Sequence, residues 1–217
     1  MQKIVYSSAV RVSDYPDLKG DGRLKAGSGL GGYFSSKWRI EELVKEAGFE
    51  SWTILQPAWL MSNLRAPSAA FYFPELKSER VLKTAYEAET RLQVLDPKDV
   101  GVFAKEALTC GIGRWNGRVV PLAGEEITIG GIADAINSWI GRSGRGKGKG
   151  KVRAEFMVGE EREKMKVLNP MVPAQIWIME NGSGVDLDKV RGYGVQMGTL
   201  EEFLERETAA MNQALEG

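Results

Sequence analysis

Two short apolar segments with a helical pattern between them constrain most strongly what this chain can fold into. Lys3–Ser7 (KIVYS) and Trp52–Gln56 (WTILQ) are rich in β-branched and aromatic residues, which predicts two buried strands, the second ended by Pro57. A helix is expected over residues 36–47, with Gly48 favouring a left-handed cap. Its apolar stripe, expected to face a core, consists of Ile40, Leu43, Val44 and Ala47. Strand, helix and strand in this order predict a parallel crossover unit and hence an α/β protein.

The middle of the chain adds a second helix and a third strand. In LDPKDVGVFAKEALT, Asp96 is expected to cap a helix over residues 97–109 that has a proline at its first position. Val119–Leu122 predicts the third strand. Two further helix starts are indicated by Thr128 and by the capping box of Thr199 and Glu202. We expect the three strands to be parallel neighbours, with helices 36–47 and 97–109 against the faces of their sheet.

Three regions lack a regular apolar period. Residues 11–32 are polar and rich in glycine, which predicts a loop, and residues 67–92 are expected to form a loop or short elements that shape a pocket wall. In GRSGRGKGKGKVR (141–153), Arg and Lys alternate with glycine, which predicts a flexible, solvated basic loop. A phosphate or nucleic-acid patch is the alternative. No aromatic residue is interleaved to stack on a base, so we predict no nucleic-acid partner.

Histidine is absent from the 217 residues, and this restricts the available chemistry. Ser-His-Asp and Cys-His nucleophile systems and the usual zinc sites are excluded, so no metal site is predicted. Acid-base catalysis must then fall to Tyr, Lys, Asp or Glu. The 29 basic and 29 acidic residues balance, so no overall field draws the protein to nucleic acid or to an anionic membrane.

Cysteine content and apolar patterning bear on location. The single cysteine, Cys110, excludes an internal disulfide and suits a reducing compartment, which predicts a cytoplasmic or possibly a nuclear protein. No run of about 18 or more apolar residues occurs, and the first residues, MQKIVYSSAV, lack the pattern of a signal peptide. No membrane association is predicted.

The stretch GSGLGGYFSSK (27–37) contains a G-x-G-x-x-G pattern at Gly27, Gly29 and Gly32. A dinucleotide-binding glycine turn directly follows a buried strand and opens the crossover helix, with an acidic residue about 20 positions later. The preceding PDLKGDGRLKA has no strand pattern, and the next strand ends in Gln56 and Pro57 without an acidic residue. We therefore interpret these glycines as a flexible loop.

The same stretch carries a Tyr-x-x-x-Lys pattern at Tyr33 and Lys37. Four residues apart at the start of a helix, the two side chains project from one face, so an ammonium can lie near a phenol. The pKa of tyrosine is normally about 10, and a neighbouring cation lowers it towards the strength useful in a general acid. Ser8 follows the first predicted strand, and the carboxyl ends of parallel strands form the ligand crevice of such sheets. Strand-end capping by Ser7 and Ser8, and a solvated Lys37, are the alternatives.

Four segments in order give the chain a family resemblance. IVYSSA, YFSSKWRIEELVKEAG, WTILQPAWLMSNL and LDPKDVGVFAKEAL resemble the later half of NmrA-like proteins, which are atypical short-chain dehydrogenase/reductases. The segment IWIMENGSGVDLDKVRGYGVQMGTLEEFL resembles the tail of fungal members. The resemblance extends over essentially the whole chain.

The resemblance implies a partial Rossmann fold, a doubly wound parallel sheet with a small C-terminal substrate lobe. Residues 1–140 would be the C-terminal part of the NAD(P)-binding domain, with 64–92 contributing to the substrate lobe, and 141–217 would be the basic loop and C-terminal lobe. By motif, Tyr33 matches the proton donor, Lys37 the nicotinamide-ribose lysine and Ser8 the serine that binds a substrate carbonyl. The segment expected to contact the cofactor NADP or NAD comprises Ser7, Lys37, Pro57, Ala58 and Trp59.

The family's glycine-turn half, which normally precedes KIVYSS, has no counterpart in this sequence. The expectation is a truncated chain that binds its cofactor weakly and leaves one sheet edge uncovered for self-association or a protein partner. Three interpretations follow: an oxidoreductase of a small carbonyl or alcohol substrate, a non-catalytic redox-sensing regulator, or an inactive fragment. In many relatives another residue stands at the position of Tyr33, and those members are regulators.

Overall fold

The computed structural model describes residues 2–18, 20–25, 27–143 and 150–216. The chain forms two compact units, each assembled from three separate segments. Unit 1 comprises Met1–Ala58, Pro97–Gly124 and Ser183–Met197, and unit 2 comprises Trp59–Asp96, Glu125–Gly182 and Gly198–Gly217.

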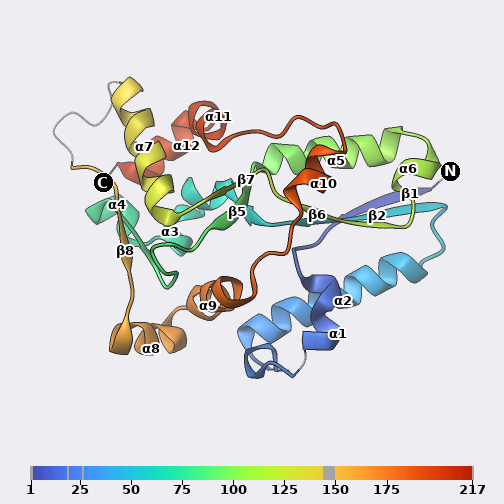
Figure 1. Ribbon diagram of the computed structural model, residues 1–217, viewed down its shortest axis with the longest axis horizontal. Helices are drawn as coiled ribbons and strands as arrows, with labels where there is room; N and C mark the ends of the chain where they lie inside the picture. The colour runs from blue at the N-terminus through green and yellow to red at the C-terminus, as the bar shows by residue number, and fades with distance from the viewer. Residues whose placement is uncertain (1, 19, 26, 144–149, 217) are drawn as a thin grey trace. The chain divides into compact units, whose positions relative to one another are not determined.

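A parallel three-stranded sheet forms the centre of unit 1 (Figure 1). Its strands are β1 (Lys3–Ser7), β2 (Ser51–Pro57) and β6 (Arg118–Leu122), in the order β1-β2-β6. This confirms the three predicted strands as parallel neighbours. Two details of the prediction were wrong: β1 is half-buried because, within the described residues, it pairs only with β2, and Pro57 belongs to β2. The partner role expected for the β1 edge stays a prediction.

Helices α2 (Gly29–Glu46) and α5 (Pro97–Thr109) lie against opposite faces of this sheet (Figure 1). The doubly wound α/β arrangement expected from the sequence is thereby confirmed. The predicted orientation of α2 was wrong, since Ile40 and Leu43 are exposed. Val44 of the predicted stripe is buried, together with Gly31, Phe34 and Glu41. A charged residue on the buried face hides this orientation from a pattern search based on apolar residues.

Residues 11–32 are more ordered than the predicted loop. They contain η1 (Val12–Asp14), α1 (Tyr15–Leu18), η2 (Gly22–Leu24) and the first turn of α2. The start of α2 lies seven residues before the predicted position, because the Ser28 side chain accepts a hydrogen bond from the Gly31 amide and caps the helix there. At the other end Gly48 adopts the predicted left-handed conformation, with φ 75°.

Unit 1 is completed by the short helices α6 (Ile112–Trp115) and α10 (Leu187–Arg191). The Trp115 ring stacks on Tyr193 with centroids 5.1 Å apart, and Phe103 of α5 meets Tyr193 edge-on at 5.8 Å. These aromatic contacts bring residues 183–197 to the α5 side of the unit.

Unit 2 contains two small sheets. In one, β3 (Trp59–Leu60) pairs parallel with β5 (Leu92–Leu95), which pairs antiparallel with β7 (Glu125–Ile127); in the other, β4 (Val81–Thr84) pairs parallel with β8 (Arg153–Phe156). The helical segments of unit 2 are η3 (Met61–Leu64), α3 (Ala69–Tyr72), α4 (Glu75–Glu79), α7 (Ile129–Ser143), α8 (Gly159–Leu168), α9 (Met171–Asn181), α11 (Leu200–Arg206) and α12 (Thr208–Leu215). The sequence indicated short elements over 67–92, but it missed the strands.

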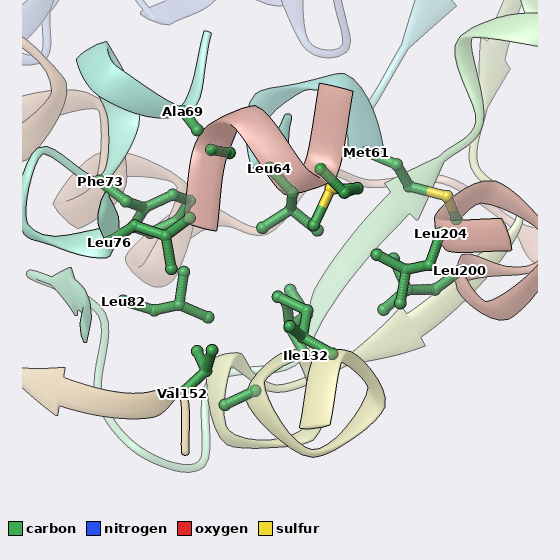
Figure 2. Packing of buried hydrophobic residues seen from close by; sticks show 14 of the residues in the cluster. Met61, Leu64, Ala69, Phe73, Leu76, Leu82, Ile132, Val152, Leu200 and Leu204 are labelled. Carbon is green, nitrogen blue, oxygen red and sulfur yellow. The ribbon is translucent and has the colours of Figure 1, made fainter. Parts of the chain in front are cut away.

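The core of unit 2 is apolar and draws on segments far apart in the chain. Figure 2 shows Leu64, Phe73 and Leu82 from the first segment beside Ile132 and Leu204 from the other two, all of them buried. The caps predicted at Thr128 and at Thr199 with Glu202 are both present. Within the described ranges no helix has the length and apolar character that crossing a membrane would require.

Residues at the start of α5 and at the end of α7 carry two further predictions. Pro97 is the first residue of α5 as expected. Both carboxylate oxygens of Asp96 accept hydrogen bonds from Arg206, at 2.7 and 2.8 Å, and the cap expected at Asp96 stays a prediction. Of the predicted basic loop, residues 144–149 lie outside the described residues. Arg142 belongs to the last turn of α7.

Candidate functional site

The predicted site residues of unit 1 lie where β1 and β2 end. The Ser8 amide donates to the Leu55 carbonyl at 2.7 Å, and the Val10 amide donates to the Pro57 carbonyl at 3.1 Å. The Ala58 amide in turn donates to Leu122 of β6 at 2.8 Å. These bonds extend the parallel pairing beyond the strands and align Ser8 with the end of β2. Carboxyl ends of neighbouring parallel strands are the usual ligand edge of such a sheet.

Lys37 connects α2 to this edge. Its Nζ donates to the Ser8 carbonyl at 3.5 Å and lies 5.5 Å from the centroid of the Tyr33 ring and 5.7 Å from that of Tyr6. Burial lowers the pKa of Lys37, and the negative charge of Glu41 acts in the opposite direction. The ammonium is thus held between two phenol rings and a strand-end carbonyl.

Ser8 and Tyr33 differ in their exposure. Ser8 is 4% exposed, and its hydroxyl has no hydrogen-bond partner of normal geometry within the described part of the chain. Tyr33 is 46% exposed and packs edge-on against Phe34, with ring centroids 5.9 Å apart. A buried hydroxyl without a partner loses free energy on folding, so Ser8 is suited to bind an oxygen supplied by a ligand.

A buried polar network lies behind Lys37. Glu41 is 0% exposed, and its two carboxylate oxygens accept hydrogen bonds from the Ser13 hydroxyl and the Gln56 amide, each at 2.8 Å. The Gln56 amide also donates to Ser13 at 2.8 Å. The two bonds to Glu41 join α2 to η1 and β2, and the third joins β2 to η1, so the network fixes the helix against the sheet.

Tyr6 adds a second phenol to the site. Burial raises the pKa of Tyr6, and the Glu41 charge raises it further. The nearby Ser8 hydroxyl acts in the opposite direction, although no hydrogen bond of normal geometry joins it to Tyr6. Tyr6 therefore stays protonated to a higher pH than an exposed tyrosine.

Sequence reasoning brought together Tyr33, Lys37 and Ser8 but missed the residues that surround them. Glu41 stands four positions after Lys37 and eight after Tyr33, so helical periodicity alone places all three on one face of α2. That signal was available. By contrast, the parts of Ser13 and Gln56 follow only from the packing of η1 and β2.

The other predicted cofactor contacts fall in both units. Ser7 is the exposed last residue of β1, opposite Leu55, and Pro57 and Ala58 follow at the end of β2. Trp59 belongs to unit 2, where its ring lies 6.4 Å from that of Phe73. The structure thus groups three of these contacts around the strand ends of unit 1.

The structure explains two of the glycines in the stretch 27–32 by backbone conformation or close packing. Gly27 has a left-handed φ of 93°, whereas Gly29 and Gly32 have open space where a side chain would begin. A side chain on Gly31 would lie 2.2 Å from the Lys25 carbonyl oxygen, so only glycine fits there without a shift. The close approach therefore involves a glycine outside the G-x-G-x-x-G pattern.

Within the described ranges, no group of three or more Cys, Asp or Glu side chains is arranged to hold a metal ion. The side chains gathered here supply two phenols, one ammonium, one hydroxyl and one buried carboxylate. Such a set can transfer protons and bind an oxygen atom.

Comparison with known proteins assigns a family to this arrangement. The model of the NmrA-like family matches residues 26–203. No match is found among curated proteins.

Several solved structures share the fold. An NADPH-dependent quinone oxidoreductase from Escherichia coli, solved with NADPH, is similar with a TM-score of 0.64 and 16% identity over 96% of this chain and 66% of that one. NmrA, a negative transcriptional regulator solved with NAD, is similar with a TM-score of 0.61 and 15% identity, over 100% of this chain and 68% of that one. An isoflavone reductase is similar with a TM-score of 0.62 and 15% identity, over 94% of this chain and 65% of that one. The chain thus spans about two thirds of each structure, and at these identities the likeness shows the Rossmann-like fold alone.

Proposed function

Since the chain belongs to the NmrA-like family, we propose that it is an NAD(P)-dependent oxidoreductase of a small carbonyl or alcohol substrate, with Tyr33, Lys37 and Ser8 as its catalytic residues. The observation that supports this most directly is the grouping of these three residues at the ends of β1 and β2. Unit 1 would hold the nicotinamide.

The side chains suit the parts that a carbonyl reduction requires. NADPH or NADH, when bound, supplies the hydride to the carbonyl carbon. The Tyr33 hydroxyl would give its proton to the carbonyl oxygen, and the nearby Lys37 ammonium would stabilise the phenolate left behind. The Ser8 hydroxyl would donate a hydrogen bond to the same oxygen, which satisfies its buried and unpaired state.

The residues also fit the nicotinamide side of the cofactor. Lys37 would bind the nicotinamide ribose, and Ser7, Pro57 and Ala58 would line the ring. The partly buried ammonium and the strand-end backbone are the observations that favour this.

Replacing Tyr33 by Phe tests the proposal because it removes only the hydroxyl. NADPH oxidation should be followed over a panel of aldehydes, ketones and quinones at saturating cofactor. Tyr33→Phe should lower turnover by about 10²- to 10⁴-fold and leave cofactor affinity nearly unchanged. Tyr193→Phe is the matched control, since the Tyr193 ring packs against Phe103 and Trp115 and belongs to no proposed site; it should change turnover less than twofold.

A non-catalytic regulator is the second candidate, favoured by the likeness to a negative transcriptional regulator over the whole of this chain. In that case no carbonyl would be turned over, and Tyr33→Phe would leave nucleotide binding unchanged. Wild-type activity in Tyr33→Phe would instead rule out the proton-donor role.

A further inference from the structure

A basic cavity in unit 2 lies among elements that the proposed function does not use. It has a volume of about 400 Å³ and lies between the end of α4, the start of β8 and the end of α12. The lining residues are Lys77, Ser78, Glu79, Arg80, Gly150, Lys151, Arg153 and Leu215. Four basic side chains and one acidic side chain thus face a space of the size that binds small ligands.

Arg80 is the residue that makes this cavity unusual. It is 8% exposed, yet no carboxylate lies within ion-pair distance of its guanidinium among the described residues. Among the described residues its side chain donates one hydrogen bond, to the Gly150 carbonyl at 3.3 Å. The guanidinium has five N–H donors, so an anion in the cavity would gain charge-assisted hydrogen bonds from it.

The surrounding structure holds Arg80 in place. Its backbone is left-handed, with φ 58°, where it closes α4 by donating to the carbonyls of Glu75 and Leu76. The Arg153 amide donates to the Arg80 carbonyl at 2.9 Å, and the Arg153 guanidinium donates to the Glu79 carbonyl at 3.0 Å. These contacts fix the Arg80 backbone beside the β4–β8 pairing before any ligand binds.

Arg153 is the one lining cation that pairs with a carboxylate in the described part of the chain, since its Nε lies 2.9 Å from Glu155. Lys77 and Lys151 are exposed side chains at the rim. Both can turn towards an anion held by Arg80, because their stems are free to rotate.

We propose that this cavity binds a small phosphate-bearing anion, with Arg80 as the buried anchor and Lys77 and Lys151 at the rim. Planar guanidinium groups recognise phosphate oxygens through paired hydrogen bonds, and lysines add charge. A cavity of this size suits a phosphate ester or diphosphate better than a polymer. The site is independent of the nicotinamide chemistry proposed for unit 1.

Calorimetric titration of the full chain with inorganic pyrophosphate tests this site. We expect saturable binding of one anion per chain. Arg80→Met should weaken it by about tenfold or more, and Lys151→Met by about threefold, because charge-assisted hydrogen bonds are lost. Arg91→Met is the matched control: it removes one exposed positive charge that pairs with Glu126 and does not line the cavity.

The outcomes separate the alternatives. Circular dichroism checks that Arg80→Met is folded, and if it is not, Lys151→Met carries the test since that side chain is exposed. Absence of saturable binding would overturn the proposal, as would equal losses in Lys151→Met and Arg91→Met, which would indicate general charge attraction. A single-stranded oligonucleotide that binds through Lys151 while pyrophosphate does not would show that the ligand class is wrong.

Discussion

Removing the Ser13 hydroxyl should cost more stability than a partly exposed serine normally contributes. In Ser13→Ala the fully buried Glu41 carboxylate loses one of its two hydrogen bonds, the 2.8 Å bond from Ser13. Hydrogen bonds to charged groups contribute about 1.5–3 kcal/mol each. The Gln56 amide keeps its bond to Glu41 but loses its neutral 2.8 Å bond to the Ser13 oxygen, so the expected loss in the free energy of unfolding is about 2–4 kcal/mol.

The same change in a Glu41→Gln background isolates the role of the charge. A neutral amide keeps the volume of Glu41, and a hydrogen bond between neutral groups contributes only about 0.5–1.5 kcal/mol. The cost of Ser13→Ala should therefore fall by about 1 kcal/mol. Urea unfolding of the four proteins of this cycle, followed by circular dichroism, measures the difference.

Ser36→Ala is the matched control, because the Ser36 hydroxyl is exposed on α2 and bonds only to the Tyr33 carbonyl within the described structure. It should change stability by less than about 0.5 kcal/mol. If Ser13→Ala cost the same in both backgrounds, the reasoning would be refuted, since Glu41 would then not act as a buried charged acceptor.

Three further results are expected. Glu41→Gln should lower the pKa of Lys37 further, because burial already lowers this pKa and the Glu41 charge opposes that shift. The measurement is an NMR titration of the Lys37 side chain, and a midpoint that rose or stayed constant would contradict the expectation. Gly31→Ala should destabilise the chain by about 2 kcal/mol or more, because the added methyl group clashes with the backbone of Leu24 and Lys25. Gly32→Ala has open space for the methyl group and should stabilise α2 by about 0.5–1 kcal/mol. Equal urea midpoints for the two variants would be inconsistent with the packing. The chain should bind NADPH no tighter than about millimolar. The reason is that the cofactor contacts matched to the family, such as Lys37 and Pro57, all belong to the nicotinamide side. A low-micromolar dissociation constant from calorimetry would disprove this.

Local patterns predicted the central elements of unit 1 well. The strand Val119–Leu122 appears as β6 with one more residue, and Pro97 opens α5. The start of α2 was predicted too late, since glycines suggest a loop until the Ser28 cap is seen in place. These features depend on interactions between residues that are close together in the sequence.

The grouping of distant segments into the two units could not be predicted from local sequence patterns. Each unit gathers three stretches that are far apart in the sequence, and β4 and β8 pair although more than 65 residues separate Thr84 from Arg153. The short strands of unit 2 were missed because two to four residues carry too little periodicity to distinguish a strand from a loop.

The sequence by itself determined the α/β class, the parallel order of the central strands and the grouping of Tyr33 and Lys37 on one helix face, because these depend on spacings of a few residues. Only the tertiary structure decided which polar groups are buried and what they contact. Glu41 receives its hydrogen bonds from η1 and β2, and Arg80 is buried without a carboxylate partner among the described residues. The free energy of a buried charge depends on distant groups that exclude water and supply hydrogen bonds, and a local pattern contains no record of them.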